Sequence, residues 1–222
     1  MDGKLYANRL SWFKELEGGG GRGDEYEGVA VLNSTGVTMR IENPNPAFGP
    51  THEVLIGDES IVGPIRFHSN HFDNLNLYCM SSFQADDFKH YPSDNPGERL
   101  HQLELPQGVL GLGKYAVAIT NTDEFMKRVK RAVDRNQYMM WSNVVEYYDP
   151  TIGVNYDPSD LRVAFSKRDI YSYQKEFRIA ILTKVLDPKP LTLDIGRIDD
   201  IAFALETASL PSILWRFNNN IA

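Results

Sequence analysis

Short stretches of alternating or β-branched hydrophobic residues recur along the chain, and this pattern predicts many short β-strands. Between residues 28 and 67 such stretches are separated by Asn, Pro and Gly, which is typical of small antiparallel strands joined by turns. We therefore expect a β-meander inserted at 28–67. Further strands are expected at 74–83, 115–119, 144–148, 161–165 and 176–182.

Helical spacing of hydrophobic residues is confined to a few segments. A short strand at 5–7 passes into a helical segment at 10–17, and a longer helix is expected from a cap at Thr122 to Arg135. The apolar stripe of this longer helix is expected to pack on a sheet. Residues 198–208 are also compatible with a helix. Together these segments predict an α+β fold that is rich in β-structure, with a few flanking helices.

The chain has 222 residues, of which 42% are hydrophobic and 24% are charged. This length and composition predict a single domain over 1–222 with a packed interior. No apolar run approaches the roughly 20 residues of a membrane span, and the first residues carry no apolar signal segment. One cysteine cannot form an intramolecular disulfide, so we expect a cytoplasmic protein with no membrane partner.

The formal net charge of −7 argues against non-specific binding to duplex DNA. One side of the expected helix at 125–135 is nevertheless basic. We interpret this side first as an ordinary exposed polar face, with an RNA or phosphate contact surface as the alternative, which the salt dependence of binding would separate. The basic residues are Lys127, Arg128, Lys130, Arg131 and Arg135.

We expect no metal site. No Cys or His motif has the spacing of a zinc site, and the neighbouring His68 and His71 are typical of loop or strand-end residues. A magnesium-dependent nuclease could use Asp86, Asp87 and Asp123, but no spacing singles these residues out, and an exposed acidic surface explains them better.

The most informative segment is the polar, aromatic loop at 165–175 that runs directly into the apolar strand expected at 176–182. Gln174 and Glu176 are two positions apart, so on a strand their side chains would share one face. A carboxylate held at the rim of a rigid strand is suited to stabilise a developing positive charge. The alternate face of the strand would carry Phe177, Ile179 and Ile181.

Arg178 also falls on the face of Glu176. The alternative interpretation of Glu176 is therefore a surface ion pair with Arg178, which would contribute little to stability and nothing to catalysis.

Tyr-Gln-Lys-Glu at 173–176 resembles the ADP-ribosyltransferase superfamily, in which an aromatic-bearing loop precedes a Gln/Glu-x-Glu motif that opens a strand. The resemblance implies a β-rich split sheet, NAD as co-substrate, and Glu176 as the residue that stabilises an oxocarbenium-like transition state. It implies that Gln174 orients the acceptor. Tyr171 or Tyr173 would contact the target.

The same resemblance places two further motifs. Ser81 closes the strand expected at 74–83, which we expect to be buried on both faces over its second half, and would support the nicotinamide pocket. The NAD-binding residues expected near the N-terminus are Tyr6, Asn8 and Arg9. Arg22, in a glycine-rich segment, competes with Arg9 as the arginine that binds the NAD phosphates, and both remain open.

Four short motifs together also look like those of bacterial phage-defence proteins: Leu-Tyr-x-Asn at 5–8, Arg-x-Asp-x-x-Glu-Gly at 22–28, Cys-Met-Ser at 79–81 and Tyr-x-x-Glu-Phe-Arg at 173–178. The relative that this pattern resembles most is the mRNA-modifying toxin of a toxin, antitoxin and chaperone system. This implies a nucleic-acid acceptor, with RNA favoured over DNA, and an antitoxin protein as partner. The alternative from another class is a non-enzymatic interaction or sensor module whose acidic surface binds a basic partner. NAD binding would discriminate the two hypotheses.

Overall fold

The computed structural model describes residues 1–16, 23–33, 37–41, 47, 52–56, 65–93, 99–184 and 189–216, with backbone pairing alone for 37–41 and 52–56. The fold is α+β, with mostly antiparallel strands in several sheets and few helices. No helix in these described ranges is long and apolar enough to cross a membrane. Whether the whole chain forms one domain stays a prediction.

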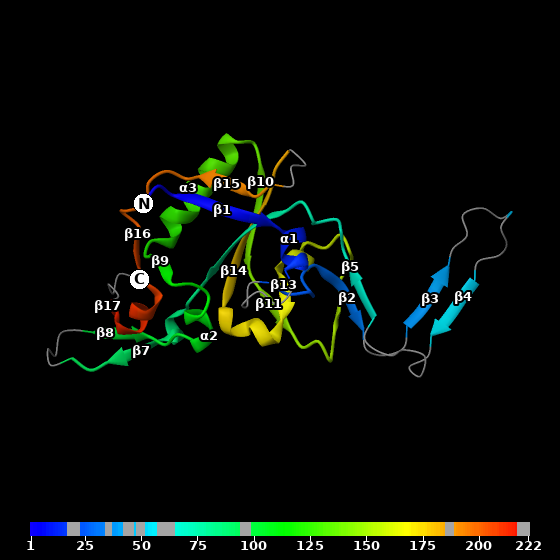
Figure 1. Ribbon diagram of the computed structural model, residues 1–222, viewed down its shortest axis with the longest axis horizontal. Helices are drawn as coiled ribbons and strands as arrows, with labels where there is room; N and C mark the ends of the chain where they lie inside the picture. The colour runs from blue at the N-terminus through cyan, green and yellow to red at the C-terminus, as the bar shows by residue number, and fades with distance from the viewer. Residues whose placement is uncertain are drawn as a thin grey trace, which may run out of the picture.

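A five-stranded antiparallel sheet forms the centre of the structure (Figure 1). Its strand order is β10 (Met139–Val144), β14 (Glu176–Leu182), β6 (Asn76–Ser81), β1 (Lys4–Arg9) and β15 (Leu191–Asp194).

The two faces of this sheet bury different partners. Helix α3 (Thr122–Arg135) covers one face, where its Phe125 and Val129 pack with Ile179 and Ile181 of β14. Helix α1 (Leu10–Glu15) lies on the other face, where Leu10 packs in a cluster that contains Ala180. The predicted face of Phe177, Ile179 and Ile181 is therefore confirmed. The helix cap is Asn121 rather than Thr122, because the Asn121 side chain accepts a hydrogen bond from the Glu124 N–H.

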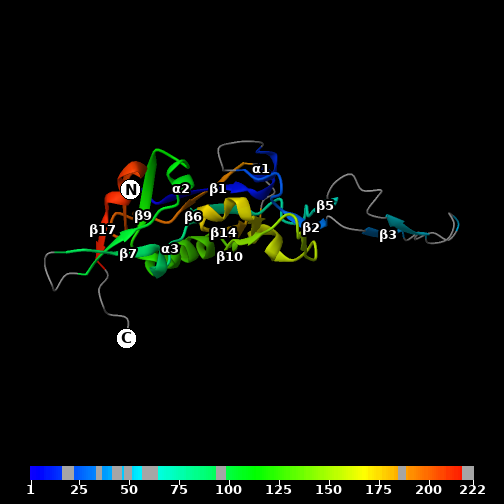
Figure 2. The same cartoon turned by 90° about the horizontal axis from the view of Figure 1, so that it is seen from below.

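The remaining strands form small sheets around this centre. Strands β12 (Val154–Asn155), β2 (Val29–Asn33) and β5 (Ile65–His68) form one, and β3 (Val37–Ile41) pairs with β4 (His52–Ile56). In both views the β3–β4 pair stands apart from the body, beyond β2 and β5 (Figures 1 and 2). The others are β17 (Leu214–Arg216) with β8 (Leu100–Leu103) and β7 (Phe88–Tyr91), β16 (Ala202–Glu206) with β9 (Tyr115–Ile119), and the parallel pair β11 (Glu146–Tyr148) and β13 (Ser166–Arg168).

Short helices connect these strands. They are α2 (Gln107–Leu110) and the 3₁₀ helices η3 (Ala85–Asp87), η4 (Leu161–Phe165), η5 (Asp169–Gln174) and η6 (Thr207–Ser212).

Three further sequence predictions are wrong in detail. Residues 161–165 form η4 instead of a strand, because the Asp160 side chain accepts the Arg162 N–H and starts a turn. Residues 198–208 are not a helix, because β16 pairs with β9 across five residue pairs. In β6 the first residues, Asn76 and Leu77, are the buried ones, because β1 pairs only with this end of the strand.

Candidate functional site

Glu176 is the first residue of β14, and Ser81, the last residue of β6, lies directly opposite it. The structure thus brings together the expected catalytic carboxylate and the expected serine. Both are at the end of the central sheet where β14 emerges from the loop.

Gln174 also meets Glu176, but not through strand periodicity. Gln174 is the last residue of η5, and Lys175 adopts a left-handed conformation with φ of 45° before the strand begins. The Lys167 ammonium donates to Gln174 Oε1 at 2.9 Å and to Glu176 Oε2 at 3.2 Å. A turn and a shared lysine therefore join the two side chains.

Glu176 belongs to a buried network of four charges. Arg178 donates from Nε to Glu176 Oε1 at 2.6 Å and through both terminal nitrogens to Glu27, at 3.0 and 2.7 Å. Lys167 lies 3.6 Å from Glu27. The side chain of Arg178 is 1% exposed, so the interpretation of a surface ion pair with Glu176 is wrong. Two carboxylates and two cations balance each other inside the protein.

The charges of this network set the ionisation of Glu176. Burial raises the pKa of Glu176, but the charges of Arg178 and Lys167 and their hydrogen bonds outweigh burial and lower the pKa to about 2. Burial lowers the pKa of Lys167, whereas Glu176 and Glu27 raise it above the ordinary value. Burial and the neighbouring Glu176 raise the pKa of the Cys79 thiol. Near neutral pH the site therefore holds an ionised carboxylate, an ammonium, a guanidinium and a neutral thiol.

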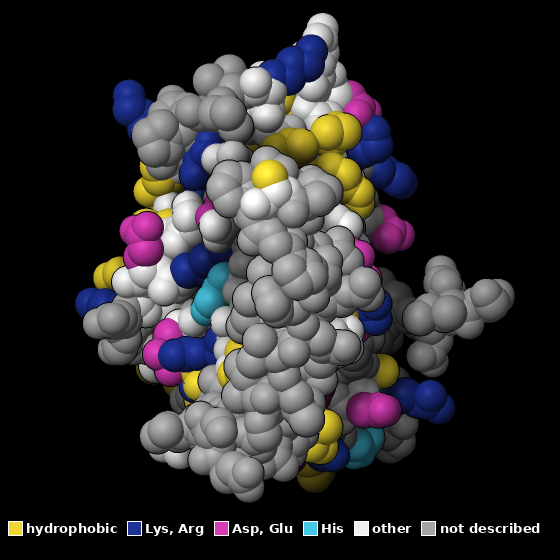
Figure 3. Space-filling model, turned by 90° about the vertical axis from the view of Figure 1, so that its right-hand side faces the viewer, with side chains coloured by type: hydrophobic (Ala, Val, Ile, Leu, Met, Phe, Trp, Pro, Cys, Tyr) yellow, Lys and Arg dark blue, Asp and Glu magenta, His cyan; other side chains and the backbone are white. Residues whose placement is uncertain are grey.

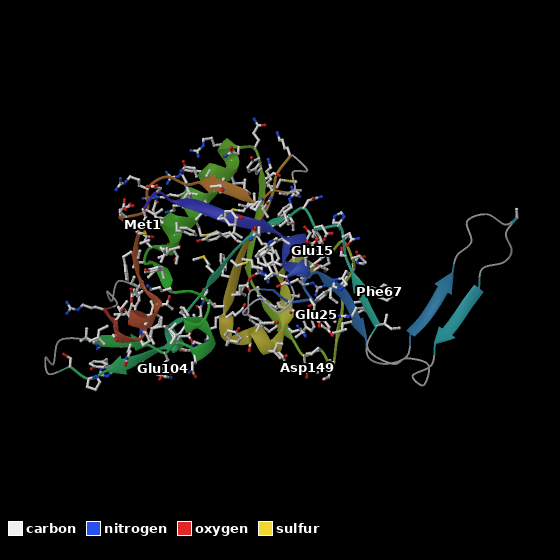
Figure 4. The ribbon with its side chains drawn as sticks, viewed as in Figure 1. Met1, Glu15, Glu25, Phe67, Glu104 and Asp149 are labelled. Atoms are coloured by element: carbon white, nitrogen blue, oxygen red, sulfur yellow. The ribbon has the colours of Figure 1, made fainter. Side chains whose placement is uncertain are left out.

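A turn at 24–27 supplies the acidic side of the site. Asp24 is buried and accepts from Arg168 Nε at 2.8 Å, while Glu27 enters the network described above. The Arg168 guanidinium also lies over the rings of Tyr26, at 4.1 Å, and Tyr171, at 5.6 Å. Figure 4 shows Glu25 of the same turn beside this segment, where it lies 3.9 Å from Arg168.

Sequence reasoning assigned no role to Asp24 and Glu27. The signal that could have found them is Asp-Glu-Tyr-Glu-Gly at 24–28, a pair of acids three residues apart closed by Gly28 at a φ of 70°. A turn of this kind can direct both carboxylates to the same side.

A pocket of about 200 Å³ lies beside this end of β14. The Tyr147 hydroxyl is part of its wall and accepts a hydrogen bond from the Glu176 N–H at 2.9 Å. Burial raises the pKa of Tyr147, so the hydroxyl keeps its proton at neutral pH. An ion pair between Lys175 and Asp87 lies at the same pocket. The lining residues are Ser82, Gln84, Asp87, Val144, Val145, Tyr147, Lys175 and Glu176.

The two expected target-binding tyrosines have contacts within the protein. Tyr171 lies under the Lys167 ammonium at 4.8 Å. The Tyr173 hydroxyl accepts from Gln174 Nε2 at 3.3 Å, and its ring lies so close to Gly108 that a Cβ at this glycine would come within 2.5 Å. Both tyrosines are half-buried.

The expected NAD-binding residues of the N-terminal strand are not brought to Glu176. Arg9 is buried and donates to Asn74. Directly opposite residues share a face of the sheet, and Arg9 lies opposite Asn76, which in turn lies opposite Ile181 near the far end of β14. It is therefore on the α3 face of the sheet. Tyr6 is exposed and Asn8 half-buried in the same strand. Arg22 lies outside the described residues.

Most of the basic side chains of α3 are paired with acidic groups. Arg128 contacts Glu124 and Asp200, and Lys130 contacts Asp134. Arg131 also contacts Glu124, and Arg135 donates to the Asp194 carbonyl. On the face of the molecule seen in Figure 3, Lys and Arg side chains likewise lie among Asp and Glu side chains.

Within the described ranges, no group of three or more His, Cys, Asp or Glu side chains is placed to hold a metal ion. Asp87, one of the acids considered for a nuclease, pairs with Lys175. No protein-family model matches the chain, and neither the curated proteins nor the solved structures searched contain a significant match.

Proposed function

We propose that the protein is an NAD-dependent ADP-ribosyltransferase with an ADP-ribosyltransferase-like sheet and Glu176 as its catalytic residue. The observation that carries the proposal is the ionised Glu176 carboxylate, directly opposite Ser81, at a sheet end that borders a pocket. Perturbed ionisable groups beside a pocket are typical of functional sites.

The proposed reaction breaks the bond between the nicotinamide nitrogen and C1′ of the ribose, and the electron pair leaves with nicotinamide. The remaining ribosyl group is positively charged in the transition state, and the Glu176 carboxylate stabilises it electrostatically. An acceptor nucleophile then bonds to C1′ and releases a proton. Gln174, held by Lys167 beside Glu176, orients this acceptor.

The pocket is smaller than the roughly 300 Å³ at which ligand pockets usually begin. With a volume of about 200 Å³, it would hold only the nicotinamide and ribose end of NAD. Glu176 Oε2 accepts from Lys167 at 3.2 Å, a longer distance than the 2.6 Å between Glu176 Oε1 and Arg178. Oε2 is therefore the oxygen that would accept a hydrogen bond from the ribose hydroxyl.

RNA is the acceptor that we propose, in a phage-defence toxin restrained by an antitoxin. This part rests on the sequence resemblance, because most of the basic residues of α3 already have acidic partners.

A non-enzymatic interaction module is the second candidate. The observation that favours it is the engagement of both Glu176 oxygens, one by Arg178 and one by Lys167, in a side chain that is 6% exposed. In this alternative the buried network only holds the loop, the turn at 24–27 and β14 together.

Transfer from labelled NAD tests the two candidates. Purified protein is incubated with NAD labelled in its adenylate phosphate. Separate reactions contain RNA, DNA or a cell lysate as the acceptor. Glu176→Gln is expected to reduce transfer about 100-fold or more, because it removes the charge that meets the cation. Label on RNA would identify the acceptor.

Two control variants separate catalysis from folding. Glu27→Gln disturbs the same buried network without being part of the pocket wall, and Glu104→Gln changes an exposed carboxylate. We expect a smaller loss for Glu27→Gln and none for Glu104→Gln, with thermal melting measured for each variant. If calorimetry shows no NAD binding to the wild type, the transferase proposal fails and the interaction module remains.

A further inference from the structure

The two edges of the central sheet differ in how they are protected. Strand β15 is four residues long, contains Asp194 and follows Pro190, and Arg135 donates to its Asp194 carbonyl at 2.9 Å. Charges, prolines and covering side chains are the usual means by which an edge strand avoids pairing with another chain. This edge is therefore blocked.

Strand β10 forms the opposite edge, where the Asn143 side chain accepts a hydrogen bond from the Val144 N–H at 2.9 Å and would have to release it for another strand to pair. The other protective features are absent from this edge. Its sequence, Met-Met-Trp-Ser-Asn-Val, contains no charged residue and no proline, and its six pairs with β14 run without a register shift. Within the described part of the chain, no strand pairs with its other side. Met139 is 54% exposed and Val144 is 49% exposed, and Ser142 and Asn143 are exposed as well. An uncharged, regular and exposed edge is a template for another strand.

We propose that β10 pairs antiparallel with β10 of a second copy of this chain, across a two-fold axis perpendicular to the sheet. Such an axis keeps α3 of both copies on the same side of one continuous sheet. In a continuous sheet, residues that lie directly opposite each other point to the same face. A register in which Ser142 lies opposite Ser142 of the second copy meets this requirement. Met140 then lies opposite Val144 of the second copy, so two apolar pairs flank the axis.

The charges at the two ends of β10 favour a second copy as the occupant. Lys184 is exposed after the end of β14, beyond the Leu182 and Met139 pair, and its ammonium reaches one end of β10 by donating to Gln137. Glu146 is exposed at the other end, two residues after Val144. Antiparallel pairing brings Lys184 of each copy toward Glu146 of the other. The strand between them is uncharged, so two chains of net charge −7 meet without local repulsion.

This inference is independent of the proposed activity, although the second copy would lie beside the Glu176 pocket, whose wall includes Val144. Sedimentation equilibrium at low salt tests it, over about 1 to 100 μM protein, a range that detects a dimer with a micromolar Kd. We expect the wild type to be a dimer. Ser142→Lys should raise the dimer Kd by about 100-fold or more, because it places two like charges at the axis. The matched control, Thr192→Lys on the exposed side of β15, should leave the Kd unchanged.

A charge exchange tests the orientation without depending on a single variant that might unfold. Glu146→Lys alone and Lys184→Glu alone should each weaken the dimer, and the double variant should restore it, with all differences reduced in high salt. A wild type that stays monomeric throughout the range overturns the proposal. So does a dimer that is insensitive to Ser142→Lys, or a double variant no tighter than the single ones.

Discussion

The two faces of β14 bury different kinds of side chain. On the face toward α3, Ile179 and Ile181 are fully buried among aliphatic and aromatic side chains. On the other face, Arg178 is just as deeply buried, but only together with Glu27, Glu176 and Lys167. Apolar packing tolerates the loss of a methyl group, whereas a buried charge depends on every member of its network. Balanced charges of this kind contribute little net stability, because the cost of removing them from water offsets much of their attraction.

Removing Arg178 should produce the largest effect. Arg178→Met leaves two carboxylates buried with one cation and is expected to reduce the free energy of unfolding by about 3–5 kcal/mol. Ile181→Val, three positions along the strand on the apolar face, should cost only about 1 kcal/mol. Urea unfolding of the three proteins measures both values, and equal losses would show that the two faces do not differ.

Acid should affect the charged face next. The folded pKa of Glu176, about 2, is below the unfolded value of 4.5, so its contribution is present above pH 4.5 and is lost as the pH falls toward 2. The loss is on the order of 3 kcal/mol. Glu176→Gln should have a flatter pH profile of stability in this window, measured by chemical unfolding at each pH. Parallel profiles for the two proteins would contradict the assignment.

The turn that joins Gln174 to Glu176 should show a smaller effect. Lys175 is left-handed, which costs a residue with a Cβ about 1 kcal/mol relative to glycine. Lys175→Ala and Lys175→Gly both remove the ion pair with Asp87, so their difference isolates the backbone. The glycine variant should be more stable than the alanine variant by about 1 kcal/mol in thermal or urea unfolding. An alanine variant that equals it would contradict this reading of the turn.

The smallest effect should come from an exposed ion pair. Lys130 and Asp134 pair on the surface of α3, with both side chains more than half exposed. Lys130→Ala is expected to change the unfolding free energy by at most about 0.5 kcal/mol, because solvent screens such a pair. If Lys130→Ala lowered the free energy of unfolding by nearly as much as Arg178→Met, buried and surface charges would not differ in their contribution to stability.

Some elements follow from local patterns in the sequence. The alternation of Phe177, Ile179 and Ile181 predicts the α3 face of β14, and the apolar stripe of residues 125–133 predicts the helix that covers it. Both patterns arise within a single element, so they are visible without knowing its neighbours. The proximity of Gln174 and Glu176 was also expected, but from the alternation of side chains along a strand. In the structure it results from the left-handed turn at Lys175.

The sequence by itself determined the α+β class, the strand that begins at Glu176 and the local chemistry of an amide and a carboxylate side by side. Only the tertiary structure decided that Arg178 meets Glu27, 151 positions away, and that this makes a buried network out of what looked like a surface pair. It also decided that β10 is an edge and that Arg9 lies on the opposite face from Glu176. The physical reason is that periodicity is a property of one segment, whereas the burial and pairing of a charge depend on segments that are distant in the chain.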